Sequence, residues 1–195
     1  MKIEHTLSVY TENQVGLLNK ISIIFSRRKI SLESFNSSPS EIENIYRFTI
    51  VVNETADVVK NLVRQIEKIV DVFKVFSNTN EEIVWQQIAL YKVPTAVIMK
   101  EVKVERLLRE YGAKAVVIRE DYTVFEATGQ NEEIDKLLKE LDKYGLIEFV
   151  RSSRIAIIKS SNGVHQQVLD MQKNDPRKSP INNEYLSLKS KIFQM

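Results

Sequence analysis

The residues from position 11 to position 18, Thr-Glu-Asn-Gln-Val-Gly-Leu-Leu, mark a change in the spacing of apolar side chains. Before this stretch, residues 3–11 alternate between apolar and polar, which is the period of a half-buried strand. After it, apolar residues recur every three or four positions, which predicts a helix over residues 15–28. Asn13 precedes that helix, where a side-chain oxygen can cap free backbone N–H groups. The stretch therefore predicts a turn from a strand into a helix.

The same two periods continue outward from this turn until about residue 78. The next expected elements are strands over 30–37 and 46–52, a helix with an apolar stripe over 59–66 and a strand over 70–76. The order is β-α-β-β-α-β, in which each crossover should be right-handed. Both helices are therefore expected to cover one face of a four-stranded antiparallel sheet, the ferredoxin-like arrangement.

A second set of elements in the same order follows the polar stretch around residues 77–81. It comprises strands over 84–92, 115–119, 122–127, 147–150 and 155–159, and helices over 97–111 and 134–141. The sequence thus predicts an α+β protein with two ferredoxin-like βαββαβ domains, residues 1–78 and 79–160. We expect the polar tail, 161–195, to be mobile or to form a short docking helix.

The composition excludes several kinds of function. The chain has 195 residues, a net charge of +2, no cysteine and two histidines. It therefore lacks disulfides, thiolate metal sites and cysteine nucleophiles, and a metal site built on histidine is not expected. The small net charge does not favour nucleic-acid binding, and no apolar run reaches the roughly 18 residues of a membrane span. We expect a cytoplasmic protein without catalytic residues, metal or bound cofactor.

The turn at residues 11–18 is the strongest candidate for a binding site. The first turn of a helix presents unpaired N–H groups and a partial positive charge, which suit a carboxylate. Gly16 lets a ligand approach the backbone closely, and Asn13 offers both a donor and an acceptor to an amino acid. Leu17 and Leu18 could bound an apolar pocket. The alternative is an ordinary capped helix start with a glycine that eases the turn.

The strand predicted over Ile30–Phe35 would lie at an edge of a sheet with the strand order 4-1-3-2. It holds one charged residue and no proline, so little prevents it from pairing with a second copy of the chain. Two copies joined in this way would bring the first helix of one chain near the second strand of the other. The alternative is an edge that the tail or the second domain shields.

The first domain resembles an ACT domain, a small-molecule-sensing module of this topology. Its pattern of an acidic residue or asparagine, two residues, glycine, one residue and leucine is matched by Asn13, Gly16 and Leu18. A longer match is similar to the regulatory (small) subunit of acetolactate synthase, also called acetohydroxyacid synthase. The stretches that carry it are 7–18, 25–28, 30–34 and 62–75, and more weakly 122–124, 128–129 and 136–138.

This resemblance implies a chain without an active site of its own. It implies a partner, the large catalytic subunit, which uses thiamine diphosphate, FAD and Mg²⁺. That subunit condenses two pyruvates into acetolactate, or pyruvate with 2-oxobutyrate, in branched-chain amino acid biosynthesis. The small subunit raises the activity and confers feedback inhibition, usually by valine bound between the ACT domains of a homodimer.

The resemblance also implies which residues would bind the effector. They are Asn13, Gln14, Val15, Gly16, Leu17, Leu18, Ser31 and Leu32. The family usually has glycine and asparagine where this chain has Lys29 and Ser31, and that asparagine belongs to the effector site across the interface. Serine has one hydroxyl in place of an amide and so forms fewer hydrogen bonds.

Two other functions remain open at this stage. The first is a free-standing amino-acid-sensing ACT protein that regulates another enzyme or regulator. The second is an enzyme in its own right, which the scarcity of nucleophile and base candidates disfavours.

Overall fold

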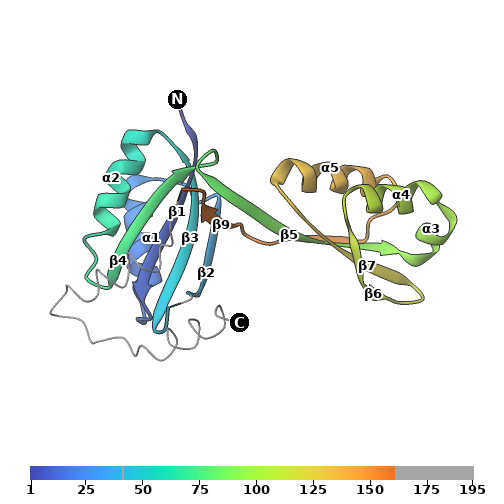
Figure 1. Cartoon of the computed structure of the whole chain (residues 1–195), viewed down its shortest axis with the longest axis horizontal. Coiled ribbons are helices and arrows are strands. Elements are labelled where there is room, and N and C mark those ends of the chain that lie inside the picture. Colours follow the sequence, from blue (N-terminus) through green and yellow to red (C-terminus); the bar gives the residue numbers. More distant parts are fainter. Residues whose placement is uncertain (41, 161–195) are drawn as a thin grey trace, which may run out of the picture. The chain divides into compact units, whose positions relative to one another are not determined.

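The computed structural model describes residues 1–40 and 42–160, so the predicted tail, 161–195, lies outside the described residues. The chain forms two compact units. One comprises Met1–Val84 with a second segment that begins at Ile157, and the other comprises Trp85–Ala156. Each unit combines an antiparallel sheet with helices, as Figure 1 shows.

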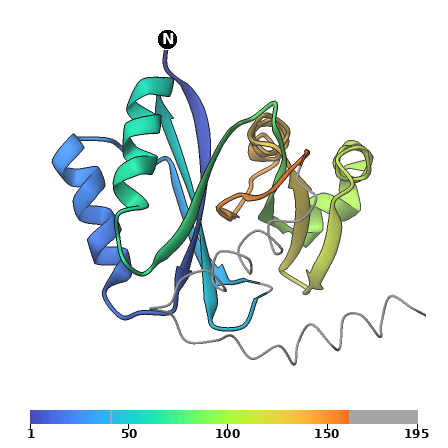
Figure 2. The same ribbon diagram turned by 60° about the vertical axis from the view of Figure 1, so that its left-hand side comes forward.

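The first unit has the predicted order of elements. They are β1 (Ile3–Glu12), α1 (Leu17–Arg28), β2 (Ser34–Pro39), β3 (Ile45–Glu54), α2 (Ala56–Ile66) and β4 (Val72–Thr79). The strands pair antiparallel in the order β2-β3-β1-β4, which confirms the predicted sheet. Both helices lie on the same face of this sheet, most clearly in Figure 2.

The hydrophobic core of this unit lies between the sheet and its two helices. Leu7 and Val9 of β1 contribute to it, as their alternation in the sequence predicts. From the helices, Ile21, Phe25 and Leu62 are each at most 2% exposed. Burial of one such side chain stabilises the fold by roughly 1.5–3 kcal/mol. The core therefore fixes α1 on the sheet, and with it the turn that precedes α1.

Helix α1 ends in a left-handed turn that is occupied by a lysine. Lys29 has φ +55° and ψ +36°, a conformation that favours glycine. Its amide donates to Ser26 O at 3.1 Å, and the amide of Ile30 donates to Phe25 O at 3.1 Å. The same pair of hydrogen bonds ends α4 (Val102–Glu110), where Gly112 occupies the left-handed position. Lys29 therefore carries backbone strain that Gly112 avoids.

Replacing Lys29 by glycine should stabilise the chain by about 1 kcal/mol, since the left-handed conformation costs a side-chain-bearing residue roughly 1–2 kcal/mol. Urea-induced unfolding, followed by circular dichroism, measures this difference. Lys29→Ala is the matched control, because alanine loses the charge and keeps the Cβ. It should leave stability within about 0.5 kcal/mol of the wild type. Equal stability of Lys29→Gly and Lys29→Ala would show that the strain is absent.

The second unit repeats the arrangement. Its elements are β5 (Ile83–Pro94), α3 (Thr95–Lys100), α4 (Val102–Glu110), β6 (Lys114–Ile118), β7 (Tyr122–Gly129), α5 (Asn131–Asp142), β8 (Glu148–Arg151) and β9 (Ile155–Ile158). The first two residues of β5 and the last two of β9 belong to the first unit. The strand order β6-β7-β5-β8 is equivalent to that of the first unit, and β9 pairs with β5. The predicted α+β fold with two ferredoxin-like units is thus confirmed.

The helix predicted over residues 97–111 is wrong in one respect, because the structure divides it into α3 and α4. Glu101, between them, has the extended angles φ −108° and ψ 91°. Its amide still closes the last turn of α3 by donating to Val97 O at 2.9 Å. Apolar spacing is similar on both sides of the break, so the sequence pattern gives no sign of it.

The polar stretch predicted as a linker is a short turn. β4 runs to Thr79 and β5 begins at Ile83, so three residues connect the two strands. The carboxylate of Glu82 accepts hydrogen bonds from the Thr79 amide at 2.7 Å and the Thr79 hydroxyl at 3.1 Å. These bonds favour the charged carboxylate and hold the pKa of Glu82 below its ordinary value.

Tyr91 occupies the centre of the second core. Its side chain is 0% exposed, and its hydroxyl donates a hydrogen bond to the backbone oxygen of Ile134 in α5 at 3.0 Å. Its ring packs against that of Phe149 in β8, with 5.1 Å between the centroids. Burial raises the pKa of the Tyr91 hydroxyl to about 12. The hydroxyl thus ties β5 to α5 while it remains protonated.

Candidate functional site

The turn between β1 and α1 has a backbone that only a few residue types adopt readily. β1 ends at Glu12 and α1 begins at Leu17. Between them, Gly16 has φ +84°, in the left-handed region. A Cβ built on Gly16 would meet no atom within 4 Å, so the space in front of this residue is open. Glycine is therefore favoured here for its conformation, and it leaves the helix start accessible.

The first turn of α1 offers hydrogen-bond donors to a ligand. Gly16 is the residue that caps α1, and no side chain caps the first turn. The amide of Leu17 donates to Gln14 O at 3.3 Å, which is long for a hydrogen bond. No acidic residue lies in this turn, so the partial positive charge of the helix end is not compensated by its own sequence. The predicted capping by Asn13 is therefore wrong.

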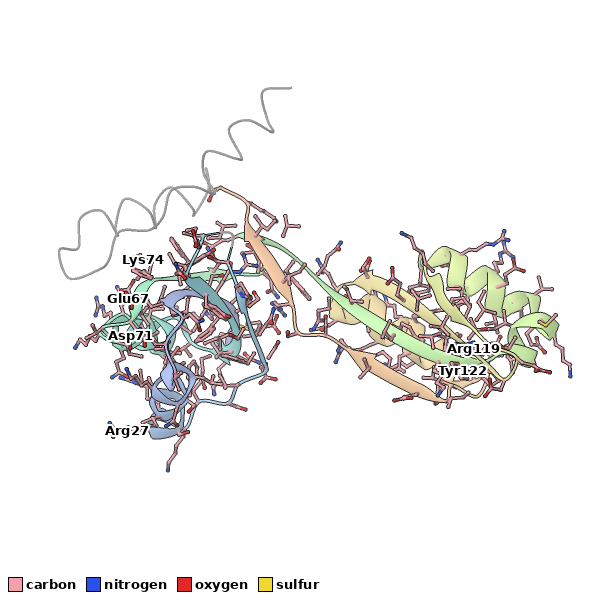
Figure 3. All side chains as sticks on the ribbon, turned by 90° about the horizontal axis from the view of Figure 1, so that it is seen from below. Arg27, Glu67, Asp71, Lys74, Arg119 and Tyr122 are labelled. Carbon is pink, nitrogen blue, oxygen red and sulfur yellow. The ribbon has the colours of Figure 1, made fainter. Side chains whose placement is uncertain are left out.

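Two contacts with the connection between α2 and β4 hold this turn in place. The amide of Glu12 donates to Asp71 O at 2.9 Å. The carboxylate of Asp71, labelled in Figure 3, pairs with Lys20 of α1 at 2.7 Å. Sequence reasoning did not find the pairing of Asp71 with Lys20, because the two residues are 51 positions apart and nothing in the sequence shows that they meet. Together they fix the start of α1 against the end of β1.

The side chains of the turn divide between the surface and the core. Asn13, Gln14 and Val15 are exposed, and Leu18 is 52% exposed. Leu17 is only 1% exposed and packs in the hydrophobic core. The expectation that Leu17 bounds a ligand pocket is therefore wrong, since its side chain serves the fold. Leu18 remains available to an apolar part of a ligand.

The sequence predicts that Ser31 and Leu32 lie in a strand, and the structure shows that they do not. They belong to the irregular segment between α1 and β2, and both are exposed. The strand begins at Ser34 and includes Pro39, so the prediction of an edge strand over Ile30–Phe35 is corrected. A strand at a sheet edge tolerates proline. β2 still occupies an edge of the sheet, and it carries no charged residue.

The structure does not bring all the predicted site residues together within one chain. Residues 13–18 lie at the start of α1, whereas Ser31 and Leu32 follow its end. α1 has 12 residues, which corresponds to a length of about 18 Å. A ligand the size of an amino acid cannot span that distance. A site that uses both groups requires them to come from two chains.

Two further features are absent from the described residues. No group of three or more histidine, aspartate or glutamate side chains in residues 1–40 and 42–160 is placed to hold a metal ion. No helix in the same part of the chain has the length and apolar character needed to cross a membrane.

Comparisons with known proteins agree over both units. The family model for the small subunit of acetolactate synthase matches residues 86–160, and the model for the acetohydroxyacid synthase small subunit-like ACT domain matches residues 7–74. The acetolactate synthase small subunit of Bacillus subtilis is 32% identical over 162 residues, 83% of this chain and 92% of the relative. That of Mycolicibacterium smegmatis is 29% identical over 160 residues, 82% and 94% respectively.

A solved structure shows the same fold. The crystal structure of the acetolactate synthase small subunit from Thermotoga maritima aligns with a TM-score of 0.73 and 22% identity. The alignment covers 81% of this chain and 98% of the Thermotoga chain. The matches therefore extend across nearly the whole length of these relatives. The chain belongs to the family of acetolactate synthase small subunits.

Proposed function

We propose that this chain is the regulatory, non-catalytic subunit of an acetolactate synthase. It binds the large catalytic subunit, raises its activity and confers feedback inhibition by valine in branched-chain amino acid biosynthesis. Thiamine diphosphate, FAD and Mg²⁺ belong to the catalytic partner, and this chain binds none of them. Membership of the small-subunit family supports this role. One structural observation supports the binding of an effector: no side chain caps the start of α1, and the space in front of Gly16 is open.

The geometry of the turn suits the groups of valine. The carboxylate meets the first-turn amides of α1, where the partial charge of the helix is positive. Asn13 supplies an amide oxygen to the ammonium group, and its amide nitrogen is a further donor. The isopropyl group packs against Leu18, which is exposed on the first turn. Each recognition element therefore has a counterpart in residues 13–18.

A homodimer completes this site in the proposal. Ser31 and Leu32 lie about 18 Å from the helix start within one chain, so they serve the site of the second copy. The edge strand β2 has no charged side chain that would oppose pairing with a second β2. Val15, Leu18 and Leu32 are 102%, 52% and 41% exposed, which is apolar surface that a second copy would cover.

Replacing Ser31 by asparagine should tighten the binding of valine by about two- to tenfold. The longer amide offers the ligand an additional hydrogen bond, whose net value is roughly 0.5–1.5 kcal/mol. Isothermal titration of valine into the purified chain measures the change. Ser31→Ala serves as the control and should not tighten binding. An asparagine variant that binds valine no better than the wild type would remove Ser31 from the proposed site.

The partnership is tested by mixing the chain with the acetolactate synthase catalytic subunit of the same organism. Size-exclusion chromatography with light scattering should show a complex that contains both chains. Dimerisation of the small subunit alone is measured in the same experiment. Two folded proteins that elute separately at micromolar concentration would favour the alternative, a free-standing amino-acid-sensing ACT protein that regulates another enzyme or regulator.

A further inference from the structure

The sheet of the second unit carries a cavity on the face opposite its helices. Strand β5 alternates, so Ala89, Tyr91 and Val93 point into the core while Leu90 and Lys92 point away from it. The cavity has a volume of about 290 Å³. Its lining residues come from β5, β7 and β8, and they are Leu90, Lys92, Tyr122, Val124, Glu148 and Val150.

The register of the three strands explains why these residues meet. Lys92 of β5 lies opposite Val124 of β7 on one side and Glu148 of β8 on the other. Two residues before Lys92 in β5, Leu90 lies opposite Val150. Because side chains of paired residues point to the same face, the cavity has two charged groups at one end and apolar groups beside them. All of them belong to regular strands of one unit.

The two charges in the cavity are close but not hydrogen-bonded. Lys92 Nζ lies 3.9 Å from Glu148 Oε2, beyond hydrogen-bond distance. The other ion pairs described in residues 1–40 and 42–160 have distances between 2.5 and 2.9 Å. Lys92 Nζ also lies 4.4 Å from the centre of the Tyr122 ring, which is labelled in Figure 3. The ammonium and the carboxylate thus both keep hydrogen-bonding capacity for a ligand.

We propose that this cavity is a second binding site, specific for a small aliphatic α-amino acid. The ligand carboxylate pairs with Lys92 and the ligand ammonium with Glu148, so that four charges of alternating sign form a ring. A spacing of 3.9 Å between Lys92 and Glu148 accommodates this ring, because the charged groups of an α-amino acid are themselves about 3 Å apart. The aliphatic side chain then packs on Leu90, Val124 and Val150.

The pair of charges selects against simpler ligands. An anion without an ammonium group would face the unpaired Glu148 carboxylate, and a cation without a carboxylate would face Lys92. The apolar lining adds a preference for an aliphatic side chain over a polar one. This site lies in Trp85–Ala156, whereas the proposed valine site belongs to the first unit, so the inference goes beyond the proposed function.

The test uses the full chain with isotopically labelled leucine and valine methyl groups and L-leucine as the probe. Saturable shifts of the methyl resonances of Leu90, Val124 and Val150 are the expected result. Two truncated probes, 4-methylpentanoate and 3-methylbutylamine, each lack one charge and should bind at least tenfold more weakly. Lys92→Met, which keeps the length of the side chain and removes its charge, should weaken the binding of leucine by about tenfold.

Matched variants separate this site from other effects. Lys139→Met makes the same change on the exposed side of α5 and should leave the leucine-induced shifts unaltered. Gly16→Asp, in the first unit, should also leave them unaltered, so failure of the valine site and failure of this site give different results. The proposal is overturned if leucine shifts none of the three residues, or if all three probes bind equally. Methyl resonances that shift with the concentration of the protein, and not with that of leucine, would also overturn it, because they identify an interface between protein chains.

Discussion

Replacing Gly16 by aspartate should raise the valine concentration that half-inhibits the holoenzyme at least tenfold, with activation retained. The added carboxylate would occupy the open space in front of Gly16, where no atom lies within 4 Å of a Cβ. It would repel the carboxylate of valine at the start of α1. Two like charges about 4 Å apart repel by roughly 1–4 kcal/mol near a protein surface, and 1.4 kcal/mol is a factor of ten in affinity.

The matched control for this prediction is Gly16→Asn. Asparagine and aspartate have the same shape, and both tolerate the left-handed backbone, φ +84°, better than other side chains do. The asparagine variant should therefore share any effect on folding and show a much smaller loss of inhibition. Equal sensitivity of the two variants to valine would mean that the effector carboxylate binds elsewhere. The measurement is acetolactate formation across a valine titration, with unfolding curves to confirm equal stability.

The free energy of unfolding should fall by about 2 kcal/mol between pH 10 and pH 12 because of Tyr91 alone. Burial raises the pKa of this hydroxyl from 10.0 to about 12 in the folded chain. Below pH 10 both states hold the proton, so stability is unaffected. Above pH 10 the unfolded chain releases the proton while the folded chain retains it, and stability declines with rising pH. A difference of two units in pKa corresponds to nearly 3 kcal/mol in total, of which about 2 kcal/mol is lost between pH 10 and pH 12.

Tyr91→Phe isolates this contribution. The variant loses the hydrogen bond to Ile134 O, which should lower its stability by about 1 kcal/mol at pH 8. Its stability should then decline less steeply than that of the wild type between pH 10 and pH 12. Urea-induced unfolding at several pH values measures both effects. Parallel pH profiles of the two proteins would contradict the assignment of a raised pKa to Tyr91.

The order of the elements and the strand order of the sheets could be predicted from sequence because they depend on periodicity. Leu7 and Val9 alternate as a strand with one buried face requires, and Leu62 belongs to a helical stripe that packs on the same core. A strand with one buried face has little freedom in its register. The pattern of apolar residues thus carries most of the information about the topology.

The start of β2 could not be predicted in the same way. Residues 30–33 look like a strand, but Ile30 instead closes the end of α1 through its hydrogen bond to Phe25 O. Lys29 adopts the left-handed conformation that makes this closure possible, and a lysine gives no signal of it in a sequence. The strand consequently begins only at Ser34, four residues later than predicted.

The candidate site was predictable in its sequence motif and not in its supports. Gly16 marks the left-handed turn, and its role follows from the missing Cβ. Asp71 and Lys20, which fix the turn, meet only through the folding of distant segments. The sequence places Leu17 beside a ligand pocket and not in the core, because a leucine at the start of a helix fits both equally well. Its direction follows from the packing of α1 against the sheet.

The most direct test of the proposed function is the rate of acetolactate formation by the organism's own catalytic subunit, with and without this chain. We predict a clear rise in the rate when the chain is added, and a fall when valine is then supplied. The same assay without the catalytic subunit should yield no acetolactate. An unchanged rate, with both proteins folded, would contradict the regulatory role, and turnover of pyruvate by this chain alone would contradict its non-catalytic nature.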